Sequence, residues 1–455
     1  MADPYDVIVI GGGPGGYHAA IRAAQLDKKT AVVEVDKPGG RCLNYACIPA
    51  KTMLHTAEIL DRAEHSAELG VTVQGASLDW EALAERRAKV SETLSGGVKM
   101  LWDKNKVAMI EGQGSLTEDG NVAVGDDTYE TEAVILATGS VALAIPGVEF
   151  SERVVDTWGA WSLPTLPKSI AVVGAGASGT EIASGYIRYG TEVTLIEMLP
   201  QILPAEDKDI ARVVERVFKK QGIEVLTGTP ISDVEPASKS VKAKVGDREL
   251  EVEYLCICGG RAPDTEGLGL EAAGVATGEG GKIEIDELQR TSNPKVFAIG
   301  DLVRGADLAH KAQEEGVVAA ETIAGVSTHP VDPNLVPGAT FCEPQVASVG
   351  MTEQQAKDAG RDVKVGRMKL GGVGASAVYD DRDGIVKLVA DAEYGEILGA
   401  HVVGNRACDM IAELVDTIAL EGGYQELARI SHAHPTISEA VLDAARAVDG
   451  WAIHQ

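Results

Sequence analysis

Two cysteines near the start of the chain have the residue type and spacing to carry electrons. Cys42 and Cys47 stand in GGRCLNYACIPAK, and the flanking Arg41 and Lys51 bring positive charge that favours a thiolate. The segment IPAKTMLHTAEI predicts a helix that Pro49 distorts, and two cysteines at positions i and i+5 of a bent helix could close a disulfide. A short, strained loop of this kind would be reduced easily, as redox chemistry requires. The alternative is a pair of thiols that never join.

A histidine near the other end of the sequence could supply the base that thiol chemistry needs. His434 precedes Pro435 in HAHPTISEA, and Glu439 follows five residues later on a predicted helix, where its carboxylate could orient the imidazole. Thiol exchange needs a base whose pKa lies near ambient pH, and histidine is the side chain that fits. We interpret the neighbouring His432 as a supporting residue.

A first glycine triplet lies upstream of the cysteines. Gly11, Gly13 and Gly16 follow a predicted strand and open a predicted helix, so they permit a tight turn, close approach of a pyrophosphate and close packing of helix on strand. Glu34 ends the next predicted strand, 18 residues after Gly16, where an acid accepts hydrogen bonds from an adenosine ribose. The pattern predicts a dinucleotide site at the helix N-terminus.

A second triplet repeats this pattern. Gly174, Gly176 and Gly179 have the same context, and Glu197 again falls 18 residues after the last glycine. A carboxylate there suits a free 2′-hydroxyl, and the following residues, MLPQ, include no basic side chain for a 2′-phosphate, so NAD is favoured over NADP. Glu181 is expected in the first turn of the helix, close to the bound nucleotide; the alternative is a surface acid that complements the helix dipole.

The elements that must position these residues form two βαβ openings and a different C-terminal part. Residues 51–110 carry helical periodicity, LPTLPK at 163–168 is a plausible linker, and strands such as GIVKLVAD and EILGAHVVG are followed by helices near the end. The predicted fold class is α/β, with two Rossmann-like dinucleotide-binding domains and an α+β C-terminal domain. At about 100–200 residues per domain, 455 residues suit three or four domains. The expected segments are 1–145, 146–270, 271–337 and 338–455.

The charge and the apolar pattern exclude some partners. The chain has 41 basic and 69 acidic residues, a net charge of −28, which argues against nucleic acid or an anionic membrane as partner. The N-terminal apolar run Val7–Ile10 is too short for a signal peptide and predicts a strand, and no apolar run approaches the length of a membrane span. We expect a soluble cytoplasmic protein. A high-salt habitat or a basic docking partner would also suit the acidic surface.

The other four cysteines predict packing. Six cysteines in a chain this long are no disulfide framework. Cys256 and Cys258 alternate in YLCICGG, a predicted strand, and are expected to face one side as small hydrophobic residues. Cys342 and Cys408 are expected to be buried. No metal site is predicted.

Several motifs together resemble a known family. GGRCLNYACIPAK, ATGS (137–140), AIGD (298–301), LAHKAQEEG (308–316) and SHAHPTISEA (431–440) resemble the class I pyridine nucleotide-disulfide oxidoreductases over the whole length and in order. The chain is most similar to the branch that oxidises protein-bound dihydrolipoamide and reduces NAD⁺. The resemblance implies FAD at the first site, NAD at the second, and a homodimer in which the histidine reaches the cysteines of the other subunit. It also implies lipoyl domains and the acyltransferase core of a 2-oxoacid dehydrogenase complex, or a glycine cleavage system, as partners.

The resemblance also gives individual residues roles. Cys42 exchanges with the substrate and Cys47 faces the flavin, while His434 is the acid–base catalyst and Glu439 its partner. Lys51, paired with Glu181, lies near the reactive flavin nitrogen. Asp301 holds the ribityl or phosphate region of the flavin, where the alternative is a helix cap or a turn residue. The residues implied to bind FAD are Gly11, Gly13, Gly16, Glu34, Arg41, Lys51, Gly114, Thr138, Gly139, Asp301 and Ala309, and those for NAD are Gly174, Gly176, Gly179, Glu181, Glu197, Val234 and Gly260.

By the same resemblance the four segments become an FAD-binding domain with the redox disulfide, an NAD-binding domain, a central domain that completes the FAD site and a dimerisation domain. Other interpretations stay open: a related NAD(P)-dependent disulfide reductase of the same fold, or mainly a structural subunit of a multienzyme complex. A glutathione-type reductase would want arginines where Glu197 stands. High-molecular-weight thioredoxin reductases and mercuric reductases need another cysteine pair near the C-terminus, beyond Cys408, and soluble transhydrogenases lack the redox pair. Departures from the usual GGTCLNVGCIPSK are Arg41, Tyr45, Ala46 and Ala50, and FCEPQVASVG is also unusual.

Overall fold

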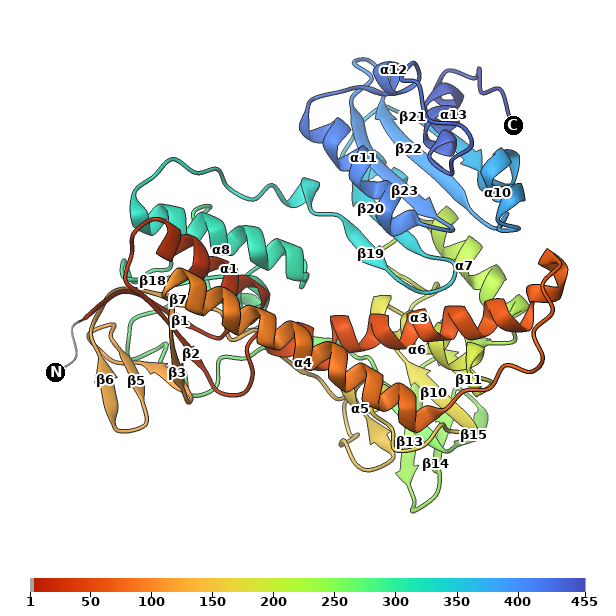
Figure 1. The fold of residues 1–455 in the computed structure, drawn as a ribbon. Helices are drawn as coiled ribbons and strands as arrows, with labels where there is room; N and C mark the ends of the chain where they lie inside the picture. Colours follow the sequence, from red (N-terminus) through yellow and green to blue (C-terminus); the bar gives the residue numbers. More distant parts are fainter. Residues whose placement is uncertain (1–3, 455) are drawn as a thin grey trace. The chain divides into compact units, whose positions relative to one another are not determined.

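The computed structural model describes residues 4–454, which form two compact units (Figure 1). The first unit combines Met1–Thr52, Glu81–Leu143 and Gly260–Pro333, and the second combines Met53–Trp80, Ala144–Gly259 and Asn334–Gln455. Each unit therefore gathers three stretches of chain.

The first unit is built on a five-stranded parallel sheet, in the order β18-β7-β1-β2-β3. Its strands read as continuous apolar runs because both faces of the sheet are covered. One face packs on α1 and α8, and the opposite face packs on small sheets and loops. The strands are β1 (Tyr5–Ile10), β2 (Thr30–Glu34), β3 (Ala108–Glu111), β7 (Thr131–Leu136) and β18 (Val296–Ala298).

Helices α1 (Pro14–Gln25) and α8 (Ala309–Ala324) lie side by side (Figure 1). Their backbones meet at two glycines: a Cβ on Gly316 would lie 2.5 Å from the carbonyl oxygen of Gly15. Only glycine allows this approach. The long helix α4 (Trp80–Asn105) brings Trp102 into the same core.

Several smaller elements complete the first unit. A three-stranded antiparallel sheet and a two-stranded ribbon flank the main sheet, and two short 3₁₀ helices follow β17 and β18. These elements are β4 (Gly114–Leu116), β5 (Val122–Val124), β6 (Asp127–Tyr129), β8 (Ser140–Ala142), β17 (Arg261–Pro263), η2 (Glu279–Gly281) and η3 (Gly300–Leu302).

The second unit contains another five-stranded parallel sheet, in the order β12-β11-β10-β16-β9. Helices α5 (Thr157–Trp161), α6 (Ala177–Arg188) and α7 (Lys208–Lys220) accompany it, with an antiparallel sheet of β13 (Ile231–Pro236), β14 (Val241–Val245) and β15 (Arg248–Val252). The parallel strands are β9 (Val154–Val155), β10 (Ser169–Val173), β11 (Glu192–Ile196), β12 (Glu224–Leu226) and β16 (Tyr254–Ile257).

The C-terminal part of the second unit is an antiparallel sheet in the order β19-β20-β23-β22-β21, with α11 and α13 on one face (Figure 1). The predicted fold class is confirmed: two Rossmann-like folds and an α+β C-terminal part. The elements are β19 (Gly338–Thr340), β20 (Val346–Gly350), β21 (Val363–Lys369), β22 (Ile385–Asp391), β23 (Ile397–Val403), α9 (Glu353–Asp358), α10 (Gly374–Val378), α11 (Ala407–Ala419), α12 (Tyr424–Leu427) and α13 (Glu439–Val448).

The cysteine segment differs from the helix expected for it. It forms two helices, α2 (Gly40–Tyr45) and α3 (Cys47–Glu64). The helical conformation is interrupted between them at Ala46, which has φ −136° and ψ −94°. Pro49 causes no distortion because it lies in the first turn of α3, where its missing N–H would have no helical acceptor. Within residues 4–454, no helix combines the length and the apolar character that a membrane crossing demands.

Candidate active site

The first glycine turn has the geometry that its sequence predicts. Gly11 has φ +103°, and a Cβ on Gly16 would overlap the carbonyl oxygen of Gly11, so neither position admits a side chain. A Cβ on Gly13 would meet no described atom within 4 Å. Gly13 caps α1 with its backbone alone, leaving the helix N-terminus free to approach a phosphate.

Glu34 closes this turn from the end of β2. Its carboxylate accepts hydrogen bonds from the backbone N–H of Gly12 at 2.7 Å and of Asp36 at 2.9 Å. Burial raises the pKa of Glu34, although these two hydrogen bonds oppose the shift. The buried acid therefore lies directly beside the turn, at the position predicted for a ribose contact.

The second glycine turn repeats the first in detail. Gly174 has φ +94°, a Cβ on Gly179 would overlap the carbonyl oxygen of Gly174, and a Cβ on Gly176 would meet nothing within 4 Å among residues 4–454. The carboxylate of Glu197 accepts hydrogen bonds from the backbone N–H of Ala175 at 2.8 Å and of a residue two positions on at 2.9 Å. Each unit therefore contains one nucleotide cradle, as we call a glycine turn together with the glutamate that accepts its hydrogen bond.

The cysteine pair begins where the first cradle ends. Cys42 and Cys47 form a disulfide, with their Cα atoms 4.8 Å apart. The N–H of Gly39 donates to the carbonyl oxygen of Gly12 at 2.9 Å, and a Cβ on Gly40 would lie 2.7 Å from the Cα of Gly13. The glycines before Cys42 thus bring the start of α2 against the glycine turn. Of the two possibilities for the thiol pair, the joined form is the one observed.

Tyr45, one of the unusual residues between the cysteines, is tied to the same loop. Its hydroxyl donates to the carboxylate of Asp36 at 2.5 Å. Burial and the neighbouring Asp36 raise the pKa of Tyr45 to about 12. The hydroxyl consequently keeps its proton and its role as donor at neutral pH.

The other residues predicted to hold the flavin all lie in the first unit. Gly114 begins β4, where a Cβ would lie 3.0 Å from the Ile10 side chain, and Ala309 is the first residue of α8. Thr138 donates its hydroxyl to the carbonyl oxygen of Asp264 at 2.6 Å. The residues Arg41, Lys51 and Gly139 belong to the same unit, in α2, in α3 and in the loop after β7.

Asp301 lies in η3 and accepts a hydrogen bond from the hydroxyl of Ser140. Arg261 donates to the same hydroxyl at 2.7 Å, and Lys282 donates to the Asp301 carbonyl oxygen at 2.8 Å. Asp301 is thus held directly by Ser140 and Lys282, and Arg261 supports it through the Ser140 hydroxyl.

Sequence reasoning missed a buried ion pair in the LAHKAQEEG motif. Lys311 and Glu315 lie 2.7 Å apart, and both side chains are buried. Glu315 also accepts a hydrogen bond from the N–H of Gly300 at 2.7 Å, next to Asp301. A signal was present, since a lysine and a glutamate four residues apart share a helix face, but such pairs are usually exposed.

Glu181 differs from expectation. It lies in the second turn of α6, and its side chain is buried, so the alternative of a surface acid is wrong. Its carboxylate accepts a hydrogen bond from the N–H of Phe341 at 2.9 Å. Lys51 belongs to the first unit and Glu181 to the second, and their pairing stays a prediction. Val234 lies in β13, and Gly260 has φ +109°.

The predicted acid–base pair lies in the second unit. The Nδ1 atom of His434 is 2.9 Å from a carboxylate oxygen of Glu439, the first residue of α13, and the imidazole is 75% exposed. Burial raises the pKa of Glu439, but the hydrogen bonds from His434 and from the N–H of Thr436 outweigh it and hold this pKa below its ordinary value. The ionised carboxylate can therefore orient the ring.

The neighbouring His432 is largely buried, with its Nε2 atom 2.5 Å from a carboxylate oxygen of Glu413. This hydrogen bond raises the pKa of His432. An ion pair that anchors the segment suits the supporting role expected for this residue.

The remaining cysteines pack much as expected. Cys256 and Cys258 face the same side, with their sulfur atoms 3.7 Å apart, and Cys342 is buried. Cys408 is only partly buried, which corrects that prediction; its sulfur lies 3.6 Å from the Thr340 carbonyl oxygen. In the described part of the chain, no cluster of three His, Cys, Asp or Glu side chains could hold a metal ion.

Family comparison agrees with this geometry. Residues 5–316 match the family model described as pyridine nucleotide-disulphide oxidoreductase, and residues 336–445 match the dimerisation domain of that family. The chain belongs to the pyridine nucleotide-disulphide oxidoreductases. The family resemblance inferred from the motifs is confirmed.

Curated relatives are similar over their whole length. The chain is 40% identical to a dihydrolipoyl dehydrogenase of Rhizobium etli, covering 98% of each protein. It is also 40% identical to a dihydrolipoyl dehydrogenase of Geobacillus stearothermophilus, covering 99% of this chain and 97% of the relative.

Solved structures share the fold. LpdA from Mycobacterium tuberculosis matches with a TM-score of 0.90 and 25% identity over 97% of this chain and 99% of its own. The HOCl-induced flavoprotein disulfide reductase RclA from Escherichia coli matches with a TM-score of 0.87 and 25% identity, again over 97% and 99%.

Family membership identifies the cofactors that the enzyme uses. This pyridine nucleotide-disulphide oxidoreductase is a flavoenzyme with FAD and NAD as cofactors and a redox-active disulfide, Cys42–Cys47. Its C-terminal part matches a dimerisation domain, which supports a homodimer. The prediction of an oxidoreductase with these two cofactors is confirmed.

Proposed function

We propose that this enzyme oxidises protein-bound dihydrolipoamide to lipoamide and reduces NAD⁺ to NADH. The observation that carries the proposal is the Cys42–Cys47 disulfide, which begins directly at the glycine turn of the first cradle. A disulfide at that position can take two electrons from a substrate dithiol next to a bound flavin. The similarity to dihydrolipoyl dehydrogenases over nearly the full length supports the choice of substrate.

The thiol half-reaction proceeds by two exchanges. The first substrate thiol gives its proton to His434, and the thiolate attacks Cys42, so that a mixed disulfide forms and Cys47 leaves as a thiolate. The second substrate sulfur then attacks the first, forming the lipoyl disulfide and releasing Cys42, which keeps the second proton. Two electrons and two protons pass from substrate to enzyme: one proton rests on His434 and one on Cys42.

The first cradle fits FAD. The open position at Gly13, the start of α1 without a side-chain cap, and the buried carboxylate of Glu34 suit a pyrophosphate and a ribose. We assign the remaining contacts to Arg41, Lys51, Gly114, Thr138, Gly139, Asp301 and Ala309. When bound, the flavin would accept the electron pair of the dithiol and pass it to the nicotinamide as hydride.

The second cradle fits NAD for the same geometric reasons. Glu197 offers carboxylate oxygens that suit a free ribose 2′-hydroxyl and would repel a 2′-phosphate. We further assign Glu181, Val234 and Gly260 to this site, and Lys51 with Glu181 to the region of the reactive flavin nitrogen. NAD⁺ is therefore the proposed acceptor.

His434 is proposed to act on the partner subunit's disulfide. Its imidazole is exposed and already oriented by Glu439, as a base that serves another chain must be. Lipoyl domains and the acyltransferase core of a 2-oxoacid dehydrogenase complex are the proposed partners, and the cytoplasm is the proposed location.

A substrate matrix tests the proposal. Purified holoenzyme is assayed with dihydrolipoamide against NAD⁺ and NADP⁺, and in reverse with NADH or NADPH against lipoamide and glutathione disulfide. We expect turnover only with the lipoyl substrate and strong preference for NAD⁺. Faster turnover of glutathione disulfide would favour the related disulfide reductase, and turnover of no disulfide would favour a structural subunit.

A further inference from the structure

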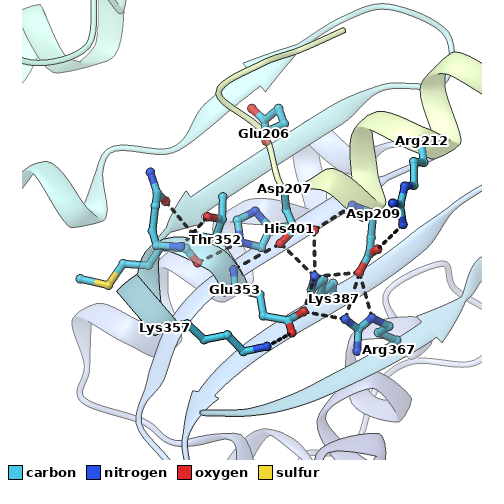
Figure 2. A network of polar contacts seen from close by, with 12 residues as sticks. Glu206, Asp207, Asp209, Arg212, Thr352, Glu353, Lys357, Arg367, Lys387 and His401 are labelled. Carbon is cyan, nitrogen blue, oxygen red and sulfur yellow. Dashed lines mark hydrogen bonds and ion pairs between the residues drawn. The ribbon is translucent and has the colours of Figure 1, made fainter. Parts of the chain in front are cut away.

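A fully buried lysine joins the C-terminal sheet to the second nucleotide-binding fold within the second unit. The Nζ atom of Lys387, on β22, lies 2.8 and 2.9 Å from the two carboxylate oxygens of Asp207, 2.7 Å from Asp209 and 2.8 Å from Glu353 (Figure 2). The lysine side chain has no exposed surface. An ammonium group buried to this degree is stable only because three carboxylates surround it.

Other groups complete this cluster, which we call the Lys387 cluster. Arg367 on β21 supplies a second cation, 3.0 Å from Asp209 and 2.7 Å from Glu353. Burial raises the pKa of Glu353, but the neighbouring Lys357, Lys387 and Arg367 outweigh it and bring this pKa to about 2. The cluster therefore keeps its charges at neutral pH.

The cluster sits at two helix N-termini (Figure 2). Asp207 caps α7, where it accepts a hydrogen bond from the N–H of Asp209 at 2.9 Å, and it accepts another from the N–H of Glu353, the first residue of α9, at 3.2 Å. Nearby, the buried His401 contacts the Met351 carbonyl oxygen at 3.0 Å, and its burial lowers its pKa. The carboxylate of Asp207 thus accepts hydrogen bonds from the first turns of both helices and links them.

The segment that Asp207 ends is the loop that leaves Glu197. Within it, the N–H of Leu203 donates to the carbonyl oxygen of Ala175, in the second glycine turn, at 2.7 Å. Leu203 holds φ +47°, a left-handed conformation that a leucine keeps only when its surroundings enforce it. Glu206 continues the connection, with its N–H 2.9 Å from the Leu203 carbonyl oxygen and its carboxylate 3.1 Å from Ser348 on β20.

We propose that Lys387 is a positioning residue for NAD⁺: by anchoring Asp207, it holds the 198–207 loop in the form that supports the second glycine turn. The inference rests on the proposed assignment of NAD to that turn. Without the anchor, Leu203 would relax from its left-handed conformation and its hydrogen bond to Ala175 would be lost. Lys387 itself makes no contact with nucleotide or substrate in this proposal.

The test replaces Lys387 with methionine in the full-length holoenzyme. We expect Lys387→Met to raise the Kd for NAD⁺, measured by calorimetry on the oxidised enzyme, by about five-fold or more, and to raise KM for NAD⁺ with it. Stopped-flow reduction of the disulfide by dihydrolipoamide without nucleotide should stay within about two-fold of wild type. An unchanged Kd, or an equal loss in both measurements, would overturn the proposal.

Two further variants keep the test decisive. Asp207→Asn keeps a side-chain oxygen to cap α7 but weakens the contact with Lys387, and Asp209 and Glu353 still neutralise the lysine, so it should fold where Lys387→Met does not. We expect a smaller rise in Kd than for Lys387→Met, and no rise would count against the proposal. Arg216→Ala is the matched control, because its ion pair with Asp383, at 3.0 Å, also joins α7 to the C-terminal part but lies further along the helix. A rise in Kd for Arg216→Ala equal to that for Lys387→Met would overturn the role of the loop.

Failure of the inference can be told apart from failure of the proposed function. If wild-type enzyme binds no NAD⁺, or dihydrolipoamide does not reduce its disulfide, the proposed function fails before any variant is compared. If both wild-type measurements succeed and Lys387→Met leaves the Kd for NAD⁺ unchanged, only the positioning role fails.

Discussion

The two nucleotide-binding folds share one set of hydrogen bonds and differ in the loop after the acid. In both, a glutamate at the end of the second strand accepts bonds from the glycine turn and from the residue two positions after itself. After Glu34 the chain returns to the turn through Gly39 and enters the disulfide helix. After Glu197 it returns through Leu203 and enters α7 and the Lys387 cluster. The same glycine turn and acid thus occur in both folds. The loop that follows the acid leads to the redox disulfide in the first fold and to the Lys387 cluster in the second.

A smaller difference lies inside the turns. A Cβ on Gly12 would lie 2.8 Å from the Glu34 carboxylate and 2.9 Å from the ring of Trp102, so the first turn needs a glycine there. The second turn has the buried Ala175 at the same place. The first cradle is therefore packed more tightly, because α4 brings an indole against it.

The largest effect should come from breaking the loop of the first fold. Cys47→Ser is expected to lower dihydrolipoamide oxidation by at least about a thousand-fold, since the electron pair then has no disulfide to enter. Flavin absorbance of the purified protein should be unchanged. Cys408→Ser, a thiol outside the site, is the control and should retain activity. Substantial turnover by Cys47→Ser would remove the disulfide from the mechanism.

The next effect should separate the two turns. Gly16→Ala and Gly179→Ala place a methyl group against equivalent carbonyl oxygens. We expect the first variant to purify with little FAD, and the second to keep FAD but bind NAD⁺ about ten-fold more weakly, as overpacking costs of this size imply. Flavin content and calorimetric Kd check both. Gly96→Ala, at an open position on α4, should change neither and slightly stabilise the helix. Equal loss of FAD in both glycine variants would contradict the assignment of the two sites.

A moderate effect is expected on the choice of coenzyme. Glu197→Arg exchanges a carboxylate that suits a 2′-hydroxyl for a cation that suits a 2′-phosphate, and should shift the ratio of kcat/KM for NAD⁺ to that for NADP⁺ by about ten-fold or more towards NADP⁺. Glu192→Arg makes the same change in charge at the other, exposed end of β11. If both variants keep the wild-type ratio, Glu197 does not read the ribose.

The smallest effect concerns acid. The pKa of Glu353 is lowered to about 2, so its ionised form stabilises the fold above its ordinary pKa of 4.5, and this stability is lost as the pH falls from about 4.5 towards 2. Burial raises the pKa of Glu34, so protonation there favours the fold and opposes acid unfolding. Glu353→Gln should lower Tm at pH 6 and flatten its decline below pH 4.5. Parallel curves for variant and wild type would show that the Lys387 cluster does not govern acid stability.

Much of this comparison could be predicted from the sequence. Both glycine turns, the acids Glu34 and Glu197 and the helices within residues 51–110 follow from local patterns, because each depends on neighbours in the chain. The disulfide remained one of two possibilities until the geometry was known. Alanine favours helix, so nothing in the sequence indicated the helix break at Ala46, and the distortion was expected at Pro49 instead.

The buried charges could not be predicted. Lys387 in GIVKLVAD reads as a polar residue on the exposed side of a strand, and its partner Asp207 is 180 residues away. Glu181 lies on a helix, and Lys311 and Glu315 form an i,i+4 pair on another. Charged residues at such helical positions are usually exposed to solvent. Burial of a charged group depends on which distant segment covers it, and no local pattern records that.

The Lys387 cluster also constrains how this sequence can change. Removing one member of a buried ion network leaves an uncompensated charge and typically costs about 3–5 kcal/mol, whereas replacing the whole network with apolar residues can be neutral. The cluster joins α7, α9, β21 and β22, so an apolar replacement would require several simultaneous substitutions in four separate segments. Every single substitution in the cluster is therefore expected to lower stability, and the network can be replaced without that cost only by exchanging its members together.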